Sequence, residues 1–335
     1  MSESNRLISF LQVFGIILVV IGHSFVEQDI PLLYNWIYNF HMPLFMFISG
    51  YLFLYAPMSK KQKIDDIKLL GTKGFIFKKF KRLIIPYIFI SSITFFPKVF
   101  LSRYALRPIE LSLDSWWHML IYPLNNVIIY FWFLPTLFII MLIVISATKL
   151  FNKLIIKIPF ILLLIICLFL NIFNPLKQIE FLNLSGVVNY LLYFVLGIYF
   201  CKKQFVFQNL FNKYLYQITF TLLLLTILFS TINIYSIIKA ITGIFFSISI
   251  SYIYIRNNWK FFNHLNGSSY AIYLFSWYPQ SFIRVLFSYK DISWQLSMIL
   301  SIILGIYFPF LLYKFFIFIK KRFKYGKQFA LLFGQ

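Results

Sequence analysis

Long apolar runs, each separated from the next by a short polar or basic segment, dominate the hydrophobic pattern of this chain. A helix that crosses the hydrocarbon core of a membrane needs about 20 predominantly apolar residues, and ten runs approach this length. The pattern therefore predicts an all-α fold, a polytopic transmembrane helix bundle that residues 1–335 form as a single domain. The ten predicted spans cover approximately residues 7–26, 35–55, 84–101, 130–148, 158–173, 186–201, 214–232, 237–255, 270–288 and 294–318.

Composition supports a membrane protein and excludes an ordinary soluble domain. Hydrophobic residues make up 61% of the chain and charged residues 12%, whereas a soluble domain carries about 25% charged residues. The mean hydropathy is +0.83, and the 44 Phe residues exceed what one soluble core buries. The two cysteines, Cys167 and Cys201, lie in or at the end of predicted spans, and this placement predicts neither a disulfide nor a metal site.

The net charge of +22 indicates membrane topology rather than nucleic-acid binding. Basic residues form clusters between apolar runs, as at Lys60, Lys61 and Lys63, and after the last span at 320–327. Cytoplasmic loops of membrane proteins are enriched in Lys and Arg, and with the N-terminus inside, most of the 31 basic residues fall on that side. We therefore expect a multi-pass protein of the plasma membrane with both termini cytoplasmic, in contact with lipids and without a nucleic-acid partner.

A line of polar side chains runs along the first predicted span. His23 lies sixteen residues after Leu7, roughly 24 Å along a helix, which places it in the outer part of a hydrocarbon core of about 30 Å. At about 100° per residue, Ser9, Gln12 and Glu27 fall within about 40° of His23 on the helix surface. Such a face is expected to point into the bundle. For Ser9 and Gln12, hydrogen bonds between helices are an equally good interpretation.

His23 is the strongest candidate for a catalytic group. Ionisable side chains inside spans are costly, so each is a functional candidate by default, and a neutral imidazole is a suitable general base near pH 7. Glu27 follows His23 at i+4. His41 opens the second predicted span from the outer side, at a depth similar to that of His23, and Pro43 is tolerated in the first turn of that helix.

Five segments of the chain resemble, in the same order, motifs of the acyltransferase-3 family. The segment Phe40-His41-Met42-Pro43-Leu44-Phe45 is the most specific of them and is similar to the fucose 4-O-acetylase-like branch. The others are Arg6 to Ser24, Lys79 to Tyr87, Phe131 to Leu134 and Ser269 to Pro279. Together they extend over essentially the whole chain.

The resemblance implies an integral membrane enzyme of ten helices that transfers an acetyl or similar acyl group from an acyl-CoA, such as acetyl-CoA, to a sugar hydroxyl. The implied acceptor is a cell-surface polysaccharide, such as a capsule or exopolysaccharide, or the lipid-linked precursor of one. The machinery of glycan synthesis is a candidate partner. The catalytic first-span histidine of the family corresponds to His23. The basic pair that precedes the third span corresponds to Lys79 and Arg82.

The chain departs from the family pattern at three positions. Family members usually carry an acid and, three residues on, a basic residue in the first span, where this chain has Ser9 and Gln12. Many members carry a histidine in the penultimate span, where this chain has Ser276. These departures leave open a branch of the family whose members export glycan.

O-acylation requires a base that takes the proton of the acceptor hydroxyl and donors that stabilise the developing oxyanion. His23 is expected to be the base, oriented by Glu27 or by Glu110 or Asp114, which are also candidate substrate ligands in the outer segment 102–129. Further hydrogen bonds are expected from His41, Ser49, Tyr51 and Trp132.

The donor phosphates are expected to bind cations at the cytoplasmic face. The densest basic group beside a predicted span is Lys78, Lys79, Lys81 and Arg82, although topology alone also explains a basic loop there. Because the base lies in the outer part of the membrane, the pantetheine arm is expected to follow the polar face of the first span past Gln12. A serine relay of the acyl group is the alternative.

Two other function classes share the spans and the basic inner face. A glycan exporter or flippase is the main alternative, but the chain shows no pair of Gly/Pro-broken half-helices in corresponding halves, as many transporters do. A polysaccharide polymerase would be expected to carry a large outer loop rich in Arg, and the segment 102–129 is modest. An acyl-CoA that reaches His23 would distinguish the transferase from both.

Overall fold

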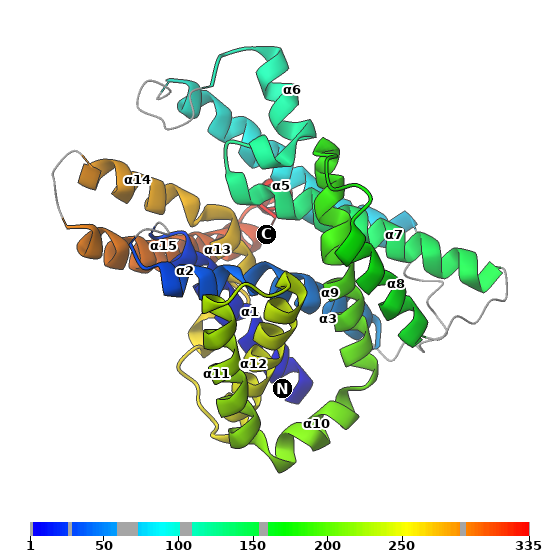
Figure 1. The fold of residues 1–335 in the computed structure, drawn as a ribbon. Helices are drawn as coiled ribbons and strands as arrows, with labels where there is room; N and C mark the ends of the chain where they lie inside the picture. Colours follow the sequence, from blue (N-terminus) through cyan, green and yellow to red (C-terminus); the bar gives the residue numbers. More distant parts are fainter. Residues whose placement is uncertain are drawn as a thin grey trace. The chain divides into compact units, whose positions relative to one another are not determined.

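The computed structural model describes residues 3–25, 29–58, 73–100, 109–153, 160–288 and 293–334. Within these ranges the regular structure is helical and contains no strand, which confirms the predicted all-α class (Figure 1). The α-helices are α1 (Glu3–Gly22), α2 (Pro31–Tyr38), α3 (His41–Met58), α5 (Lys73–Phe100), α6 (Leu113–Ile121), α7 (Phe133–Lys153), α8 (Phe160–Phe173), α9 (Leu184–Lys202), α10 (Gln204–Lys213), α11 (Leu215–Thr231), α12 (Ser236–Arg256), α13 (Ser269–Phe275), α14 (Trp277–Ser288), α15 (Trp294–Arg322) and α16 (Gly326–Leu332).

Several of these helices can cross a membrane. By length and composition, six helical segments in the described part of the chain qualify: Pro31–Ala56, Gly74–Phe100, Ile129–Thr148, Phe181–Lys202, Ser236–Arg256 and Trp294–Arg322. A seventh is added if α10 and α11, which are bent by 94° at their junction, form one span. Two further apolar helices, Arg6–Gly22 and Phe160–Phe173, are shorter. The bundle of membrane-spanning helices is confirmed, whereas the number ten and the cytoplasmic termini stay predictions.

Two differences between the helices and the approximate predicted spans bear on the candidate site. The first helix ends at Gly22 and not at residue 26. The third helix begins at Lys73, so the basic group 78–82 lies inside α5 and not in a loop before it. Lys and Arg are good helix formers, and their stems can cover apolar surface. Here the ammonium of Lys79 lies 5.3 Å from the ring centroid of Phe75, and that of Lys81 lies 4.3 Å from that of Phe77. These i, i+4 contacts continue the helix beyond the apolar run.

The ninth predicted span is two helices rather than one. α13 ends at Phe275, and α14 begins at Trp277. Ser276, at the junction, is almost completely buried.

The chain divides into two compact units, which are described separately. Unit 1 comprises Met1–Leu54 and Leu196–Lys314, and unit 2 comprises Tyr55–Val195 and Phe315–Gln335. In unit 1, α1 packs against α12, α13 and α2, and α11 packs against α12 and α2; Figure 1 shows α11 and α12 side by side.

The segment 36–40, which leads into α3, packs closely against α11 and α12. A Cβ atom at Gly243 of α12 would lie 2.1 Å from Cγ of Phe40, so the Phe40 ring packs directly on the backbone of α12. Trp36 Nε1 donates to Oγ1 of Thr226 at 3.0 Å, and Asn39 Nδ2 donates to Oγ of Ser230 at 3.4 Å. These contacts fix the segment that leads into His41.

In unit 2, α5 is the central helix and packs against α6, α7 and α16. The Tyr87 hydroxyl lies 3.1 Å and 3.0 Å from the carbonyl oxygens of Met119 and Leu120. Asn126 Nδ2 donates to Oγ of Ser91 at 2.9 Å. The described part of the predicted outer segment therefore packs on α5 and buries its polar groups in hydrogen bonds, as buried polar groups require.

Candidate active site

His23 lies in the turn that ends α1. Its backbone N–H bonds to the Val19 carbonyl at 3.0 Å, which completes the last helical turn, and the Ser24 N–H then bonds to the Ile21 carbonyl at 2.9 Å in a tighter turn. Gly22 permits α2 to approach at this point, because a Cβ there would lie 3.1 Å from Cγ2 of Ile37 and 3.2 Å from Cε2 of Tyr38. His23 is thus placed beside α2, at the end of α1 rather than within it.

The Tyr38 hydroxyl contacts Nδ1 of His23 and favours one tautomer of its ring. The Tyr38 hydroxyl lies 3.2 Å from Nδ1 of His23 and donates to the Gly22 carbonyl oxygen at 3.3 Å. A hydroxyl has one proton and two lone pairs. When its proton goes to the carbonyl, its oxygen accepts the Nδ1–H of His23. The neutral imidazole then carries its lone pair on Nε2, as a general base requires.

Tyr38 also contacts the second histidine. The His41 ring lies edge-on to the Tyr38 ring at 4.8 Å, and the Tyr34 ring stacks on the other side of Tyr38 at 4.0 Å. His41 is the first residue of α3 and is buried. Its Nδ1 lies 2.9 Å from the Ile37 carbonyl oxygen, which can only accept. The neutral His41 ring therefore donates to Ile37 and presents an acceptor, not a donor, at Nε2.

Gln280 of α14 fastens the end of α1. Its Nε2 donates to the Val20 carbonyl oxygen at 2.8 Å and to Oγ of Ser24 at 2.9 Å, and Ser24 Oγ donates to the same carbonyl at 2.7 Å. Only 1% of Gln280 is exposed. The last carbonyls of a helix lack partners within the helix, and Gln280 supplies one from a distant segment. Gly305 of α15 leaves room for it, because a Cβ there would lie 3.2 Å from Cγ of Gln280.

Arg284 is a cation near His23. It follows Gln280 at i+4 and so lies on the same face of α14, and it interacts electrostatically with His23. Arg284 is exposed, and a cation at this place is suited to stabilise negative charge that develops during acyl transfer. None of Arg284, Tyr38 and Gln280 was singled out from the sequence. The signal available for Gln280 was its position as a polar residue within a predicted span.

The structure places the remaining candidates of unit 1 away from this cluster. Ser49 lies eight residues after His41 on α3, about 12 Å along the helix axis. Gln12 and Ser9 lie on the first half of α1 and are half-buried. Glu27 lies outside the described residues. The structure therefore brings together His23 and His41 through Tyr38.

The other candidates belong to unit 2. Trp132 stacks on Tyr190 with ring centroids 5.2 Å apart. Glu110 and Asp114 are exposed, and Asp114 lies in the first turn of α6, where an acid is favoured by the helix dipole. Lys78 and Arg82 are exposed on α5, and Lys79 is half-buried. The substrate and donor roles assigned to these residues stay predictions.

The comparisons with known proteins agree with the motifs. A family model described as an acyltransferase domain, that of the acyltransferase-3 family, matches residues 5–314. No curated protein and no solved structure matches the chain significantly. The matched range contains the His23 cluster and all the helices that can cross a membrane, except for the last residues of α15. The chain is thus an integral membrane protein, consistent with a location in the plasma membrane, and it belongs to the acyltransferase-3 family.

Proposed function

We propose that the protein transfers an acetyl group from acetyl-CoA to a hydroxyl of a cell-surface polysaccharide or of its lipid-linked precursor. Membership of the acyltransferase-3 family supports acyl transfer. The observation that carries the proposal is the contact of His23 Nδ1 with the Tyr38 hydroxyl at 3.2 Å, since that hydroxyl also donates to the Gly22 carbonyl and thereby favours the tautomer with its lone pair on Nε2. The proposal includes two finer assignments: that the chain belongs to the fucose 4-O-acetylase-like branch of the family, and that the transferred group is acetyl.

The reaction follows from this geometry. Nε2 of His23 takes the proton of the acceptor hydroxyl while the hydroxyl oxygen attacks the thioester carbonyl carbon. The tetrahedral intermediate carries its negative charge on the former carbonyl oxygen, which Arg284 is suited to stabilise. The carbon–sulfur bond then breaks, and the CoA sulfur leaves with the proton from the imidazolium. The products are the acyl ester and CoA, and His23 returns to its neutral form.

Tyr38 is a positioning residue in this scheme. During the reaction the imidazolium donates from Nδ1 to the Tyr38 oxygen, so the hydrogen bond stabilises the charged form of the base. The ring stacking with Tyr34 and the edge contact with His41 hold the hydroxyl in place without its own participation. Removal of the oxygen alone therefore tests the hydrogen bond and not the packing.

Tyr38→Phe is expected to lower kcat about tenfold with little change in the Michaelis constant for the donor. A net hydrogen bond contributes about 0.5–1.5 kcal/mol, and about 1.4 kcal/mol corresponds to a tenfold change in rate. Steady-state kinetics of the purified protein would measure the change, with exposed Tyr235→Phe as the control. An unchanged kcat in Tyr38→Phe would show that the hydroxyl does not position the base.

Mass analysis of the surface glycan from cells with and without the protein tests the proposed function. We expect glycan of normal amount and chain length that lacks its acetyl groups when the protein is absent. Glycan that is missing from the surface but accumulates inside the cell would favour the exporter instead. Glycan with unchanged acetylation would refute the proposed acceptor.

A further inference from the structure

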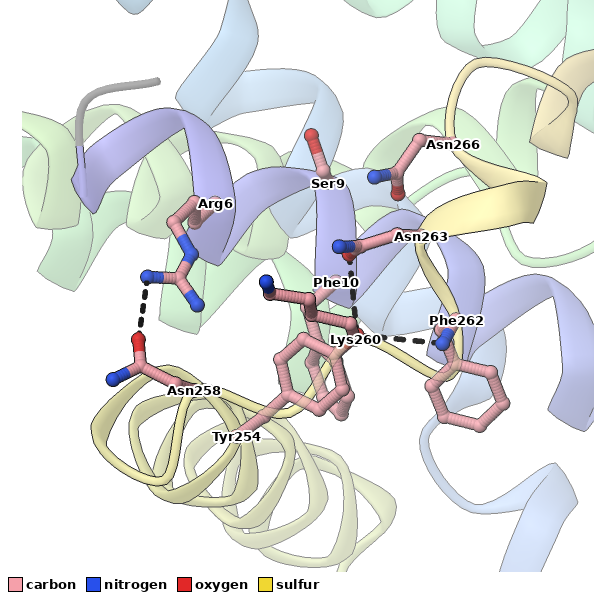
Figure 2. Close-up of a pocket in the computed structure, with 9 residues that line it drawn as sticks. All are labelled: Arg6, Ser9, Phe10, Tyr254, Asn258, Lys260, Phe262, Asn263 and Asn266. Atoms are coloured by element: carbon pink, nitrogen blue, oxygen red, sulfur yellow. Dashed lines mark hydrogen bonds between the residues drawn. The ribbon is translucent and has the colours of Figure 1, made fainter.

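A cavity of about 210 Å³ lies at the end of α1 that is remote from His23. Its walls come from the first turns of α1, and from the last turn of α12 and the loop that follows (Figure 2). Among its lining residues are two cations, three asparagine amides, one serine and three aromatic rings, and no acid. This composition suits an anion that also carries a flat ring.

The end of α12 builds one wall of the cavity. Asn258 has φ 50°, a left-handed conformation that Asn tolerates better than most residues, and the Trp259 N–H bonds to the Tyr254 carbonyl at 3.1 Å. This is the hydrogen bond that closes a helix with a left-handed residue after its end. The turn directs Oδ1 of Asn258 to Arg6, whose Nη1 donates to it at 3.3 Å. Arg6 is thereby held at the rim of the cavity.

Tyr254 holds the other wall. Its hydroxyl donates to Oδ1 of Asn263 at 3.2 Å and accepts the backbone N–H of Phe262 at 3.3 Å. Its ring lies 4.5 Å from that of Phe10, and the Phe262 ring lies 6.0 Å from that of Phe10. The loop after α12 is thus folded back onto α1, and three rings form the apolar part of the lining.

Arg6 and Lys260 supply the positive charge of the cavity lining. Figure 2 shows both side chains within the same concave region, beside the amides of Asn258 and Asn263. Arginine and lysine are the usual cationic ligands of phosphate groups, and amide NH₂ groups add donors. The cavity is smaller than the roughly 300–1,000 Å³ of a pocket that encloses a whole ligand. It is suited to one end of a larger molecule.

The cavity and His23 lie at opposite ends of the same helix, α1. Ser9 lines the cavity, and Gly22, which precedes His23, lies thirteen residues further along α1, about 20 Å at 1.5 Å per residue. Acyl-CoA has a comparable layout, because an extended pantetheine chain separates its phosphorylated nucleotide from its thioester. Gln12 lies one turn beyond Ser9, on the intervening stretch of the same helix.

We infer that this cavity binds the nucleotide end of the acyl-CoA donor, with Arg6 and Lys260 on the phosphates and the rings of Phe10, Tyr254 and Phe262 against the adenine. The inference rests on the proposed function, which supplies the donor. It assigns the phosphates to unit 1, whereas the sequence placed them at Lys79 and Arg82 of α5.

The test measures the dissociation constants of CoA and of dephospho-CoA for the full-length protein in nanodiscs of neutral phosphatidylcholine. The double variant Arg6→Gln/Lys260→Gln is expected to bind CoA at least tenfold more weakly than the parent and to lose most of the preference for CoA over dephospho-CoA. Lys203→Gln, an exposed cation of the same unit outside the cavity, is the matched control and is expected to bind CoA as the parent does.

A second variant tests the site without removing a cation. Asn258→Asp keeps the size of the side chain and tolerates the left-handed conformation, but its carboxylate pairs with Arg6 and repels phosphate. It is expected to weaken CoA binding while the thermal stability is unchanged. If the double variant and Asn258→Asp both bind CoA as tightly as the parent, the inference is overturned, and a loss of binding in Lys79→Gln/Arg82→Gln would then place the donor at α5.

Two further measurements distinguish a nucleotide from a lipid headgroup in the cavity, and donor binding from acyl transfer. If an anionic lipid headgroup occupies the cavity, native mass spectrometry of protein from phosphatidylglycerol nanodiscs will show a bound lipid that the double variant loses. The CoA affinity of the double variant would then be unchanged, and the inference would be overturned.

The CoA-binding measurement does not require acyl transfer, so binding and transfer can be tested separately. CoA binding that depends on Arg6 and Lys260, in a protein that acylates no glycan, would refute the proposed function and support the inference. Acylation with CoA binding that is independent of both residues would do the reverse.

Discussion

His23→Ala is expected to remove acyl transfer, with a fall in kcat of about 10²–10⁴, the range that general acid–base catalysis contributes. In the alanine variant no group accepts the proton of the acceptor hydroxyl, and the Tyr38 hydroxyl keeps its bond to the Gly22 carbonyl. Donor binding should persist, because the proposed nucleotide site lies about 20 Å away along α1. Acetylation of purified acceptor glycan, measured together with CoA affinity, gives both quantities.

The control for this experiment is a histidine outside the cluster. His118 of α6 is exposed and stacks on Tyr122 with ring centroids 4.5 Å apart. His118→Ala is expected to retain the parent rate. His23→Gln serves as a second test, since it keeps a polar side chain of similar reach without a basic nitrogen. Full acetylation by either His23 variant, at parent levels of inserted protein, would remove His23 from the mechanism.

Gly197→Ala is expected to give a large loss of stability, because Gly197 packs directly against the backbone of α3. A Cβ at Gly197 would lie 2.0 Å from the carbonyl oxygen of Phe47 and 2.8 Å from the backbone nitrogen of Tyr51. Small residues allow such close helix contacts in membrane proteins. Because the obstacle is backbone, α9 and α3 must separate, and overpacking of this kind destabilises by about 1–3 kcal/mol or more.

The separation would also break contacts on both sides of the glycine. The Tyr51 hydroxyl donates to Oε1 of Gln204 at 2.6 Å, and the Phe47 ring lies 5.5 Å from that of Phe200. Thermal unfolding of the purified protein would measure the loss. Gly74→Ala is the matched control, because nothing lies within 4 Å of a Cβ at that position. Equal unfolding temperatures for the two variants would contradict the close approach of α3 and α9.

Sequence reasoning located the helices because a span is a local property of the chain. Each predicted run has a helix at its place, since apolar length alone decides whether a segment can lie in lipid. The ends were less accurate where other forces act. Lys79 and Lys81 extend α5 through contacts with Phe75 and Phe77, and such contacts are invisible to hydropathy. The end of α1 at Gly22 depends on the approach of α2.

The site was predicted where a single residue type was informative. An imidazole in an apolar run is costly wherever it lies, so His23 and His41 were found without knowledge of their neighbours. Gln280 and Lys260 gain their importance from helices that meet across more than 250 residues of sequence: α14 with α1, and the loop after α12 with α1. Tyr38 is one aromatic residue among many until its hydroxyl is seen beside Nδ1 of His23.

In the proposed mechanism, the hydrogen bond from Tyr38 to the Gly22 carbonyl determines how His23 returns to its starting state between turnovers. Because the Tyr38 hydroxyl donates its proton to the Gly22 carbonyl in a hydrogen bond, its oxygen accepts the Nδ1–H of His23. Nδ1 then keeps its proton throughout, and only Nε2 gains and loses one. The proton that arrives with the acceptor departs with the CoA thiol. No water molecule is needed to convert one tautomer of the His23 ring into the other, so the catalytic cycle does not depend on bulk water. A base of this kind can operate at a depth in the membrane where water is scarce.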